Sequence, residues 1–339
     1  MLNVLIIGVG EQGKRIAQLI SECPNTIVHL YDQDFSKLDG FDSKFQIYQK
    51  RPYLELFDII VDCLPSYASH SLLLEAGTLG KTVISVSFLE EDFMQLNNLY
   101  RQEKGLLIPD CGAAPGMSHL LAAHAVCLAQ SPHTVVMKVG AIPLNPQPPF
   151  YHNLTWSLND LIEEYKRPAK VRYNGTEFTE NPLSTIKSEK IFNLKLESFI
   201  TDGLRSFLNS YPTIPRMEER TYRHKGHLEY MSSLENYNNL EQFYSLDKSD
   251  QFIMSITAIG RNYIEITYQM LNLPALVNSV AASALAAYKL IQGGFYATGV
   301  NPLEKMINYS PIILDKFIEM HRELGANIGL TINEKNIKI

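Results

Sequence analysis

Apolar and polar residues follow one pattern in the first third of the chain and another pattern after residue 116. In the first third, short runs rich in Val, Ile and Leu alternate with segments in which apolar residues recur at every third or fourth position. Uninterrupted apolar runs are typical of strands that helices cover on both faces, and the longer spacing is typical of amphipathic helices. The alternation predicts an α/β fold with a doubly wound parallel sheet. The expected strands are residues 2–9, 26–31, 57–64, 80–86 and 106–108, and the expected helices are residues 14–21, 69–77 and 92–103.

The second part of the chain carries signals of antiparallel strands. A helix predicted for residues 117–130 is followed by a strand rich in β-branched residues at 133–142. An Asn-Gly pair at 174–175 predicts a hairpin over residues 171–178. A second hairpin is expected over residues 252–268, with Gly260-Arg261 as a two-residue turn. These signals predict an α+β region with a mixed or antiparallel sheet.

A glycine motif follows the first predicted strand directly. Gly8, Gly10 and Gly13 form G-x-G-x-x-G, with Glu11 and Gln12 between the last two glycines, at the start of a predicted helix. This context is typical of dinucleotide binding, because the glycines allow a tight turn, close approach to a pyrophosphate and close helix–strand packing. The helix N-terminus favours the phosphate charge. The alternative is a plain glycine-rich turn between a strand and a helix.

An acid stands at the end of the second predicted strand. Asp32 lies about 20 residues after the glycines, where a ribose-binding carboxylate is expected. Such a carboxylate accepts a hydrogen bond from the 2′-hydroxyl of NAD and repels the 2′-phosphate of NADP. Gln33 follows, and no Arg stands beside it. We therefore expect NAD as the cofactor, in preference to NADP.

These motifs give a prediction for the two domains. Residues 1–115 together with 273–339 are expected to form a Rossmann-type dinucleotide-binding domain, because the last helical segments are similar in composition to the first part of the chain. Residues 116–272 are expected to form the α+β domain for substrate binding and oligomerisation.

Ligands of doubly wound sheets bind at the carboxyl ends of the strands. Five further residues fall on that edge and are candidates to contact the cofactor or the reacting atoms: Cys63, Leu64, Pro65, Ser87 and Asp110. The alternative for Cys63 is a small core residue. Asp110 is a candidate general base beside the nicotinamide, and its alternative role is a helix cap.

Composition and charge narrow the classes of function. Lys plus Arg number 30, Asp plus Glu number 36, and the formal net charge is −6, so the chain lacks the overall basic surplus of a nucleic-acid binder. The four cysteines form no C-x-x-C, which argues against a thiolate metal site and a disulfide framework. Residues 273–291 are Ala-rich with polar interruptions and predict a buried helix rather than a membrane span. We expect a cytoplasmic protein without metal, nucleic acid or membrane partners.

Several blocks in the second part are similar to one known family. They include D-x-G-x-A-P-G-M at residues 110–117, V-G-A-I-P at 139–143, and blocks at 151–157, 160–165 and 201–205. The last block is Y-R-H-K-G-H at 222–227. Together with the glycine motif, these blocks resemble the saccharopine dehydrogenase-like family, and within it the L-lysine 6-dehydrogenase branch. One stretch, residues 236–251, is shorter and more Asn-rich than in that family.

The resemblance implies an NAD-dependent oxidoreductase that acts on the CH–NH group of a lysine-like amino acid. It would transfer a hydride from the carbon that bears nitrogen to NAD, and the imine or semialdehyde product could cyclise. Such chemistry needs a base for the ammonium and a cation for the substrate carboxylate. The catalytic candidates are Asp110, His152, Arg223 and His227, and the substrate-binding candidates are Tyr151, Asn153, Asp202 and Arg205.

Each of these assignments has a plainer alternative. His152 is either a base or a solvated loop histidine, and Arg223 and Arg205 are either carboxylate clamps or members of surface ion pairs. The H-x-x-H spacing of His224 and His227 lacks a third ligand cluster and therefore does not predict a metal site.

Three functions remain open from the sequence. The first is the lysine-like dehydrogenase, and the second is a saccharopine-type reductase that forms a secondary amine from an amino acid and a carbonyl compound. The short second domain favours the smaller substrate. The third is a non-catalytic dinucleotide-binding sensor or scaffold, which the altered stretch 236–251 would explain. A homodimer is expected in each case.

Overall fold

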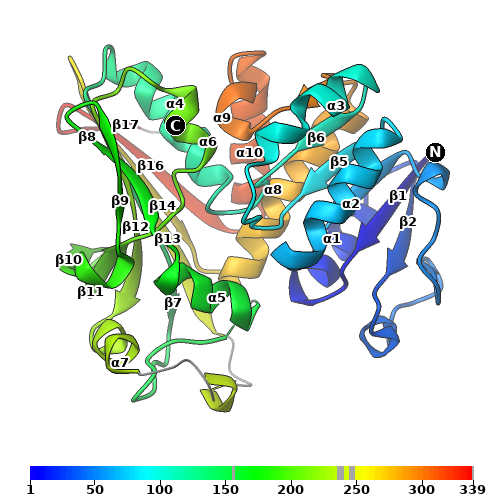
Figure 1. The fold of residues 1–339 in the computed structure, drawn as a ribbon, viewed down its shortest axis with the longest axis horizontal. Helices are drawn as coiled ribbons and strands as arrows, with labels where there is room; N and C mark the ends of the chain where they lie inside the picture. Colours follow the sequence, from blue (N-terminus) through cyan, green and yellow to red (C-terminus); the bar gives the residue numbers. More distant parts are fainter. Residues whose placement is uncertain (155–156, 235–239, 244–248, 338–339) are drawn as a thin grey trace. The chain divides into compact units, whose positions relative to one another are not determined.

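The computed structural model describes residues 1–154, 157–234, 240–243 and 249–337, and within it the chain forms two compact units. Unit 1 consists of Met1–Met117 and Val280–His321, and unit 2 consists of Ser118–Ser279 and Arg322–Ile339 (Figure 1). Each unit is therefore built from two separate stretches of sequence. Most of the predicted stretch 236–251 lies outside the described residues.

Unit 1 contains a parallel sheet of seven strands among the described residues, in the order β15-β6-β5-β4-β1-β2-β3. The strands are β1 (Leu2–Ile7), β2 (Thr26–Tyr31), β3 (Gln46–Ile47), β4 (Ile59–Asp62), β5 (Thr82–Ser85), β6 (Leu106–Ile108) and β15 (Gly299–Val300). The predicted α/β fold with a doubly wound parallel sheet is confirmed.

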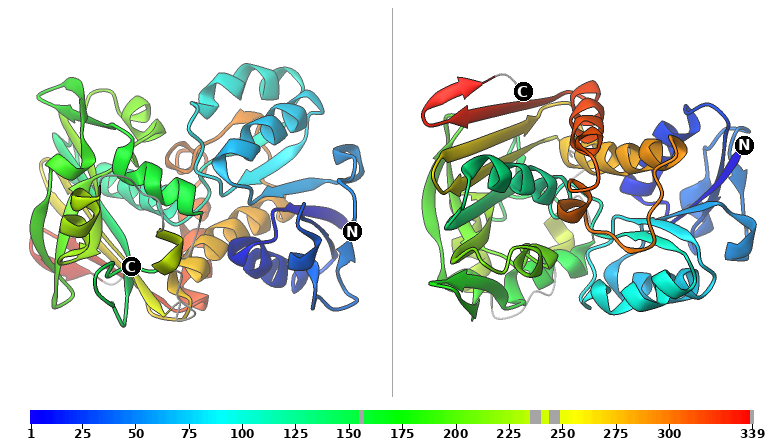
Figure 2. Two further views of the ribbon diagram at one scale, coloured as in Figure 1. Left: turned by 60° about the horizontal axis from the view of Figure 1, so that its bottom comes forward. Right: turned by 90° about the horizontal axis from the view of Figure 1, so that it is seen from above.

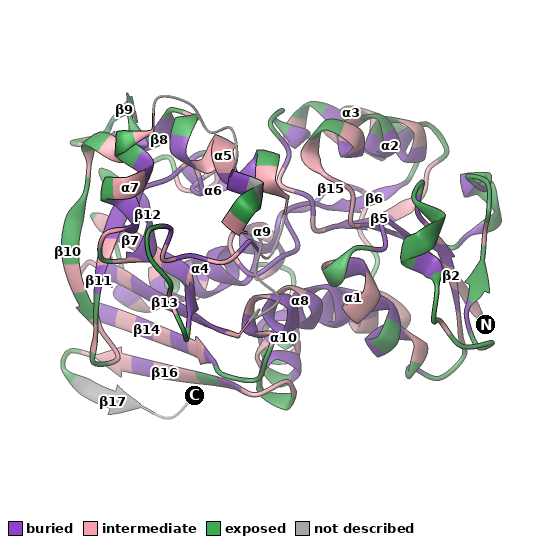
Figure 3. Ribbon diagram, turned by 90° about the horizontal axis from the view of Figure 1, so that it is seen from below, coloured by how far each residue is buried: buried purple, intermediate pink, exposed green. Residues whose placement is uncertain are grey.

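Helices cover both faces of this sheet. The helices α2 and α3 lie on one face, and α1 and α8 lie on the other (Figure 3). The bounds are α1 (Glu11–Ser21), α2 (Ser66–Thr78), α3 (Asn97–Gln102), α8 (Ala275–Gln292), α9 (Leu303–Met306) and α10 (Pro311–Glu323), with short 3₁₀ helices at Phe35–Leu38, Leu54–Leu56 and Phe93–Leu96. Apolar side chains of α2 and α3 pack on alternate residues of the central strands, so that burial of both faces holds the sheet.

Unit 2 contains a mixed sheet of ten strands in the described part of the chain. Eight strands follow the order β10-β11-β12-β7-β13-β14-β16-β17, and β8 pairs with β12 and β9. The neighbours β12 and β7 are parallel, and the other pairs are antiparallel. The strands are β7 (Thr134–Pro143), β8 (Ala169–Tyr173), β9 (Thr176–Glu180), β10 (Lys187–Ile191), β11 (Leu194–Ile200), β12 (Arg216–His224), β13 (Asp250–Ile259), β14 (Tyr263–Met270), β16 (Ala326–Ile332) and β17 (Lys335–Ile337). The second α+β region with a mixed sheet is therefore also as expected.

The helices of unit 2 are α4 (Met117–Ala129), α5 (Leu158–Lys166), α6 (Ser206–Ser210) and α7 (His227–Ser233), with 3₁₀ helices at Pro182–Ser184 and Leu240–Phe243. Helix α4 lies along one face of the sheet (Figure 2). Its last turn is tied to the β13–β14 loop, because the side chain of Asn262 donates to the carbonyl of Leu128 over 3.0 Å.

Two expectations from the sequence differ from the structure. The β13–β14 hairpin has a three-residue loop, because Ile259 pairs with Tyr263, and the predicted two-residue turn at Gly260-Arg261 is wrong. The stretch 273–339 does not all lie in unit 1, because β16 pairs along its whole length with β14 in unit 2. Only long-range strand pairing determines that position. No helix within the described residues is long and apolar enough to cross a membrane.

Candidate functional site

The glycine loop connects β1 to α1 and leaves a space at one position. Gly8 has a φ of +89°, and a Cβ there would lie 2.5 Å from the carbonyl oxygen of Cys63. A Cβ at Gly13 would lie 2.0 Å from the carbonyl oxygen of Gly8, so close packing of α1 on β1 requires glycine. Around Gly10, the N-cap of α1, a Cβ would meet no atom within 4 Å, and no side chain caps this helix. Open space beside uncapped N–H groups fits the pyrophosphate of a dinucleotide.

The remaining residues of the motif are placed beside this space. Glu11 and Gln12 form the first turn of α1, and the side-chain oxygen of Gln12 is buried without a hydrogen-bond partner in the described structure. An unsatisfied buried acceptor of this kind needs a partner such as a ligand donor or a water molecule.

Asp32 follows β2 directly and is buried beside the glycine loop. One carboxylate oxygen accepts the backbone N–H of Val9 over 2.7 Å, and the other accepts the N–H of Asp34 over 2.9 Å. The ammonium of Lys37 lies 3.5 Å from the second oxygen. Asp32 therefore links the loop after β2 to the glycine loop, in the place that a ribose-binding acid occupies in this kind of fold. Its exposed neighbour Gln33 lies in the same loop.

A buried carboxyl that the sequence analysis did not select organises the carboxyl ends of β4 and β5. Asp62 is fully buried, and it accepts hydrogen bonds from the hydroxyls of Ser69 and Ser85 and from the N–H of Leu64. Burial raises the pKa of Asp62, and the hydrogen bonds oppose that rise. The hydroxyl of Ser87 donates to the carbonyl of Leu64 over 2.5 Å. The acid that directly follows the apolar run at residues 59–61 is the sequence signal that could have revealed this support.

The structure thus brings four predicted cofactor contacts together at this edge: Cys63, Leu64, Pro65 and Ser87. Burial raises the pKa of Cys63 well above its ordinary value, which favours the protonated thiol. Asp110 follows β6 at the same edge, is buried, and has a φ of 47°. That backbone conformation is uncommon for residues other than glycine and occurs more often for Asp and Asn.

A chain of buried polar groups runs through unit 2. Arg223 on β12 donates from Nη2 to Oε2 of Glu164 over 2.5 Å, and from Nε to the hydroxyl of Tyr165 over 2.8 Å. The hydroxyl of Tyr165 lies 2.7 Å from Nε2 of His227, and Nδ1 of His227 is hydrogen-bonded to the carbonyl of Phe150. We call these residues the Arg223 cluster. Glu164 and Tyr165 lie on α5 and were not selected from the sequence, although they belong to the quoted block 160–165.

The groups at the two ends of this series of hydrogen bonds determine which atoms carry protons. The carbonyl of Phe150 can only accept, so Nδ1 of His227 carries a hydrogen. Burial lowers the pKa of His227 to about 3, with Arg223 acting in the same direction, so the ring is neutral and Nε2 is an acceptor. The hydroxyl of Tyr165 therefore donates to His227 while it accepts from Nε of Arg223. Both nitrogens of His227 are occupied, which suits a positioning role better than the predicted direct catalytic role.

The low pKa of His227 predicts a pH dependence of stability. An unfolded histidine has a pKa of about 6.5, so unfolding below that pH takes up a proton that the native ring does not bind. This contribution to stability is complete above about pH 6.5 and is lost as the pH falls toward 3. Between pH 7.5 and pH 5, the free energy of unfolding should fall by about 2 kcal/mol less in His227→Asn than in the wild type, because the variant has no ring to protonate on unfolding. Urea unfolding at both pH values tests this, and an equal loss in His227→Asn and wild type would contradict it.

His152 lies beside the Arg223 cluster and is not part of its hydrogen-bond chain. Its ring centre lies 5.2 Å from that of His227, and the residue is only 7% exposed, so the alternative of a solvated loop histidine is wrong. Both ring nitrogens are buried and have no hydrogen-bond partner among the described residues. Burial lowers the pKa of His152 well below its ordinary value, and Arg223 adds to the effect. A neutral ring with unused nitrogens can accept a proton or bind a donor.

The predicted substrate-binding residues lie in different surroundings in unit 2. The ring of Tyr151 packs against Gly226, and Asn153 is half-buried. Asp202 accepts the backbone N–H of Lys170 over 3.2 Å, and Arg205 precedes α6 with a φ of 42°. Nε2 of His224 is hydrogen-bonded to the carbonyl of Pro143 over 2.8 Å.

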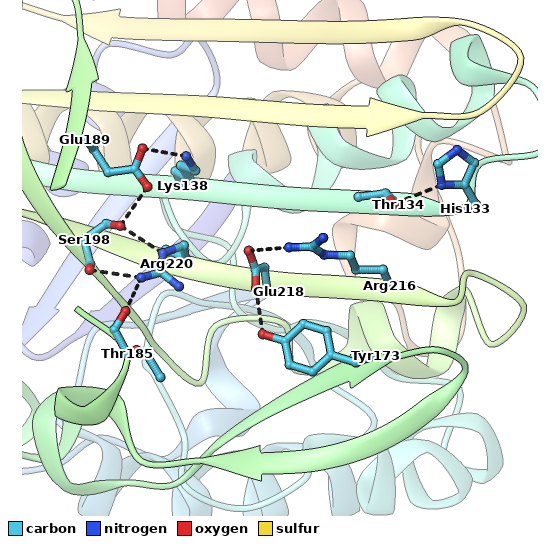
Figure 4. A network of polar contacts seen from close by, with 10 residues as sticks. All are labelled: His133, Thr134, Lys138, Tyr173, Thr185, Glu189, Ser198, Arg216, Glu218 and Arg220. Atoms are coloured by element: carbon cyan, nitrogen blue, oxygen red, sulfur yellow. Dashed lines mark hydrogen bonds and ion pairs between the residues drawn. The ribbon is translucent and has the colours of Figure 1, made fainter. Parts of the chain in front are cut away.

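A second polar network surrounds Arg220 on β12 (Figure 4). Arg220 and Arg223 are three residues apart on this strand, and alternate residues of a strand point to opposite sides, so the two lie on opposite faces. Arg220 donates from Nε to the hydroxyl of Ser198 over 2.9 Å, and Ser198 donates to Glu189, which also binds Lys138 over 2.8 Å. These bonds connect β7, β10, β11 and β12. The network holds the sheet and is separate from the Arg223 cluster.

Comparison with known families shows to which family this chain belongs. Residues 112–334, more than half of the chain, match the family described as the saccharopine dehydrogenase C-terminal domain. The chain belongs to the saccharopine dehydrogenase-like family. The resemblance predicted from the sequence blocks is therefore confirmed at the level of this family.

Two solved structures share the fold of this family member over nearly its whole length. Saccharopine dehydrogenase (L-Glu forming) from Saccharomyces cerevisiae, in the apo form, has a TM-score of 0.75 at 13% identity, covering 98% of this chain and 100% of that chain. Homospermidine synthase from Legionella pneumophila, in complex with NAD, has a TM-score of 0.71 at 13% identity, covering 98% and 92%. At such identity the likeness shows the fold.

The family match covers the polar residues of unit 2 and not the glycine loop of unit 1. The saccharopine dehydrogenase C-terminal domain match includes all members of the Arg223 cluster and His152, whereas the glycine loop and Asp32 precede it. The evidence for dinucleotide binding by this family member therefore rests on the geometry of the loop itself.

Proposed function

We propose that this protein is an NAD-dependent oxidoreductase that acts on the CH–NH group of a lysine-like amino acid. The observation that carries the proposal is the open space at Gly10 above an uncapped helix N-terminus, with the Asp32 carboxylate beside it. The homospermidine synthase of similar fold was solved with NAD, which supports the same class of cofactor. The lysine-like substrate rests on the resemblance of the sequence blocks to the L-lysine 6-dehydrogenase branch.

The residues of unit 1 would hold the cofactor in a defined way. The N–H groups at the start of α1 would bind the pyrophosphate, and Asp32 would accept a ribose hydroxyl. The loop after β4, which Asp62 and Ser87 support, would lie along the nicotinamide side. A bound NAD supplies the chemistry of hydride acceptance.

The residues of unit 2 would handle the substrate and its proton. The substrate ammonium must lose a proton before its carbon can give up a hydride, and we propose His152 as its acceptor because both of its ring nitrogens are unused. Burial lowers the pKa of His152, so its ring would pass the proton on to solvent rather than keep it. Loss of the hydride leaves a C=N bond, which water converts to an aldehyde and ammonia. Asn153, Asp202, Arg205 and Tyr151 remain the proposed substrate-binding residues, and Arg223 acts through the cluster that positions His227 and Phe150.

The decisive assay follows the absorbance of NADH with L-lysine, ornithine and diamines at about pH 9–10, near the reference lysine pKa of about 10.4. Turnover with L-lysine and NAD supports the proposal. Binding of NADH without turnover of any amine or of any keto acid in the reverse direction would instead support a non-catalytic sensor or scaffold.

Replacing His152 by Gln tests the assignment of the base. Loss of a general base typically lowers kcat by 10²–10⁴-fold, and we expect about 100-fold here with an unchanged dissociation constant for NADH. Asp110→Asn is the matched control at the other candidate base. If His152→Gln retains full kcat while Asp110→Asn loses it, the proton acceptor is Asp110 and the assignment of His152 is wrong.

A saccharopine-type reductase is the second candidate, and one observation favours it. The saccharopine dehydrogenase structure from yeast is covered over its full length by this chain, so the second domain is not too small for such an enzyme. The size of the second domain therefore does not favour a smaller substrate. Oxidation of NADH in the presence of an amino acid and a keto acid or aldehyde would favour this candidate. We further propose a cytoplasmic homodimer in either case, which sedimentation of the purified protein tests.

A further inference from the structure

We infer that Lys37 determines how strictly this protein excludes NADP, an inference that rests on the proposed function. The loop after β2 holds a charged group of each sign at the place where the 2′-substituent of the ribose would lie. Asp32 is the acid of this pair, and Lys37 is its cation, with 3.5 Å between Nζ and Oδ1. A 2′-hydroxyl needs an acceptor, whereas a 2′-phosphate needs a cation.

The two partners differ in their freedom to move. The Asp32 side chain is 6% exposed and is fixed by backbone N–H groups on both of its oxygens. The Lys37 side chain is 45% exposed and ends in an ammonium on a flexible stem. Asp32 therefore stays in place whichever nucleotide approaches, and Lys37 is the partner that can turn from the carboxylate to a phosphate.

The surrounding charges explain why NAD should still be preferred. Asp34 lies next to the pair, and its hydrogen bonds with Ser36 lower its pKa, so it is ionised. The loop therefore carries two carboxylates and one ammonium. Its net negative charge repels the 2′-phosphate of NADP. Removal of the Asp32 charge would leave only the Asp34 carboxylate to oppose the Lys37 ammonium. The local charge would then no longer be negative, and Lys37 could turn toward a 2′-phosphate.

Lys37 is also placed there by local structure. It lies in the 3₁₀ helix Phe35–Leu38, and Asp34 is the N-cap of this helix because its side chain accepts the N–H of Ser36. Leu38 of the same turn is buried and anchors it to unit 1. The position of Lys37 relative to Asp32 is therefore defined by the fold of the loop.

The test is a double-mutant cycle on nucleotide binding, measured by titration of NADH and NADPH fluorescence with the full-length protein. Asp32→Asn keeps an oxygen that can accept the N–H of Val9 and removes the charge. We expect it to tighten NADPH binding about tenfold, and we expect Asp32→Asn/Lys37→Met to lose that gain. The gain should also shrink at high salt, because Lys37 is exposed.

Lys44→Met is the matched control for the loss of one positive charge, because the Lys44 ammonium lies over the ring of Phe45. It should leave the NADPH gain of Asp32→Asn intact. If Lys37→Met has no greater effect than Lys44→Met on NADPH binding in the Asp32→Asn background, the inference about Lys37 is wrong while NADH binding still supports the proposed function. If the wild type binds neither nucleotide, the proposed function and this inference both fail.

Discussion

Replacing Arg223 by Met should lower the free energy of unfolding by about 3–5 kcal/mol, the cost typical of breaking a buried ion pair at one partner. Arg223 is 3% exposed, and its removal would leave the Glu164 carboxylate mostly buried without a cation. It would also take a donor from the hydroxyl of Tyr165, the next link toward His227. Urea denaturation measures the change directly.

A second substitution tests whether the unpaired Glu164 charge, rather than lost packing, causes the destabilisation. In Arg223→Met/Glu164→Gln no unpaired charge remains, so the double variant should be more stable than Arg223→Met alone. Arg51→Met is the control at an exposed pair, because Arg51 and Glu75 have side chains 46% and 41% exposed, and it should cost less than about 1 kcal/mol. A double variant as unstable as the single one would show that burial of the Glu164 charge is not the cause.

Replacing Gly13 by Ala should destabilise unit 1 by about 3 kcal/mol, the upper end of the cost of overpacking. The added Cβ would lie 2.0 Å from the carbonyl oxygen of Gly8, and a backbone atom at the end of β1 cannot move aside as a side chain could. Helix α1 would have to shift away from β1, and the space for the pyrophosphate would be lost with it. Thermal or urea unfolding and NADH titration measure the two effects.

Gly10→Ala is the matched control, because its Cβ would meet no protein atom within 4 Å. It should leave stability within about 0.5 kcal/mol of the wild type and still weaken NADH binding, since the methyl group would occupy the space proposed for the pyrophosphate. Tight NADH binding by Gly10→Ala would place the cofactor elsewhere. A stable Gly13→Ala variant would contradict the packing argument.

The sequence predicts unit 1 well because its signals are local. Each strand is a short apolar run beside its helix, and the glycines stand next to the strand and helix that they join, so residues 2–32 contain the whole binding motif. The same locality explains the correct placement of Leu64 and Ser87 at the carboxyl edge. By contrast, the supporting role of Asp62 depends on hydroxyls of two different elements, and a run of apolar residues does not reveal it.

The site in unit 2 is less predictable for a physical reason. Arg223 and Glu164 are 59 positions apart, and only the packing of α5 on the sheet brings them together. His152 could be selected from the sequence, but its burial and its unused nitrogens depend on that packing. The assignment of β16 to unit 2 likewise depends on pairing with β14, which its composition does not encode.

The discontinuous composition of unit 1 has a consequence for synthesis on the ribosome. Leu106 of β6 pairs with Gly299 of β15, and the hydroxyl of Thr26 pairs with that of Tyr288 in α8. The nascent parallel sheet of unit 1 therefore keeps an open edge at β6 and lacks the cover of α8 until residues 275–300 have been translated. Unpaired strand edges are prone to aggregation, so we expect the N-terminal strands to be exposed to pairing with other chains until β15 has been made.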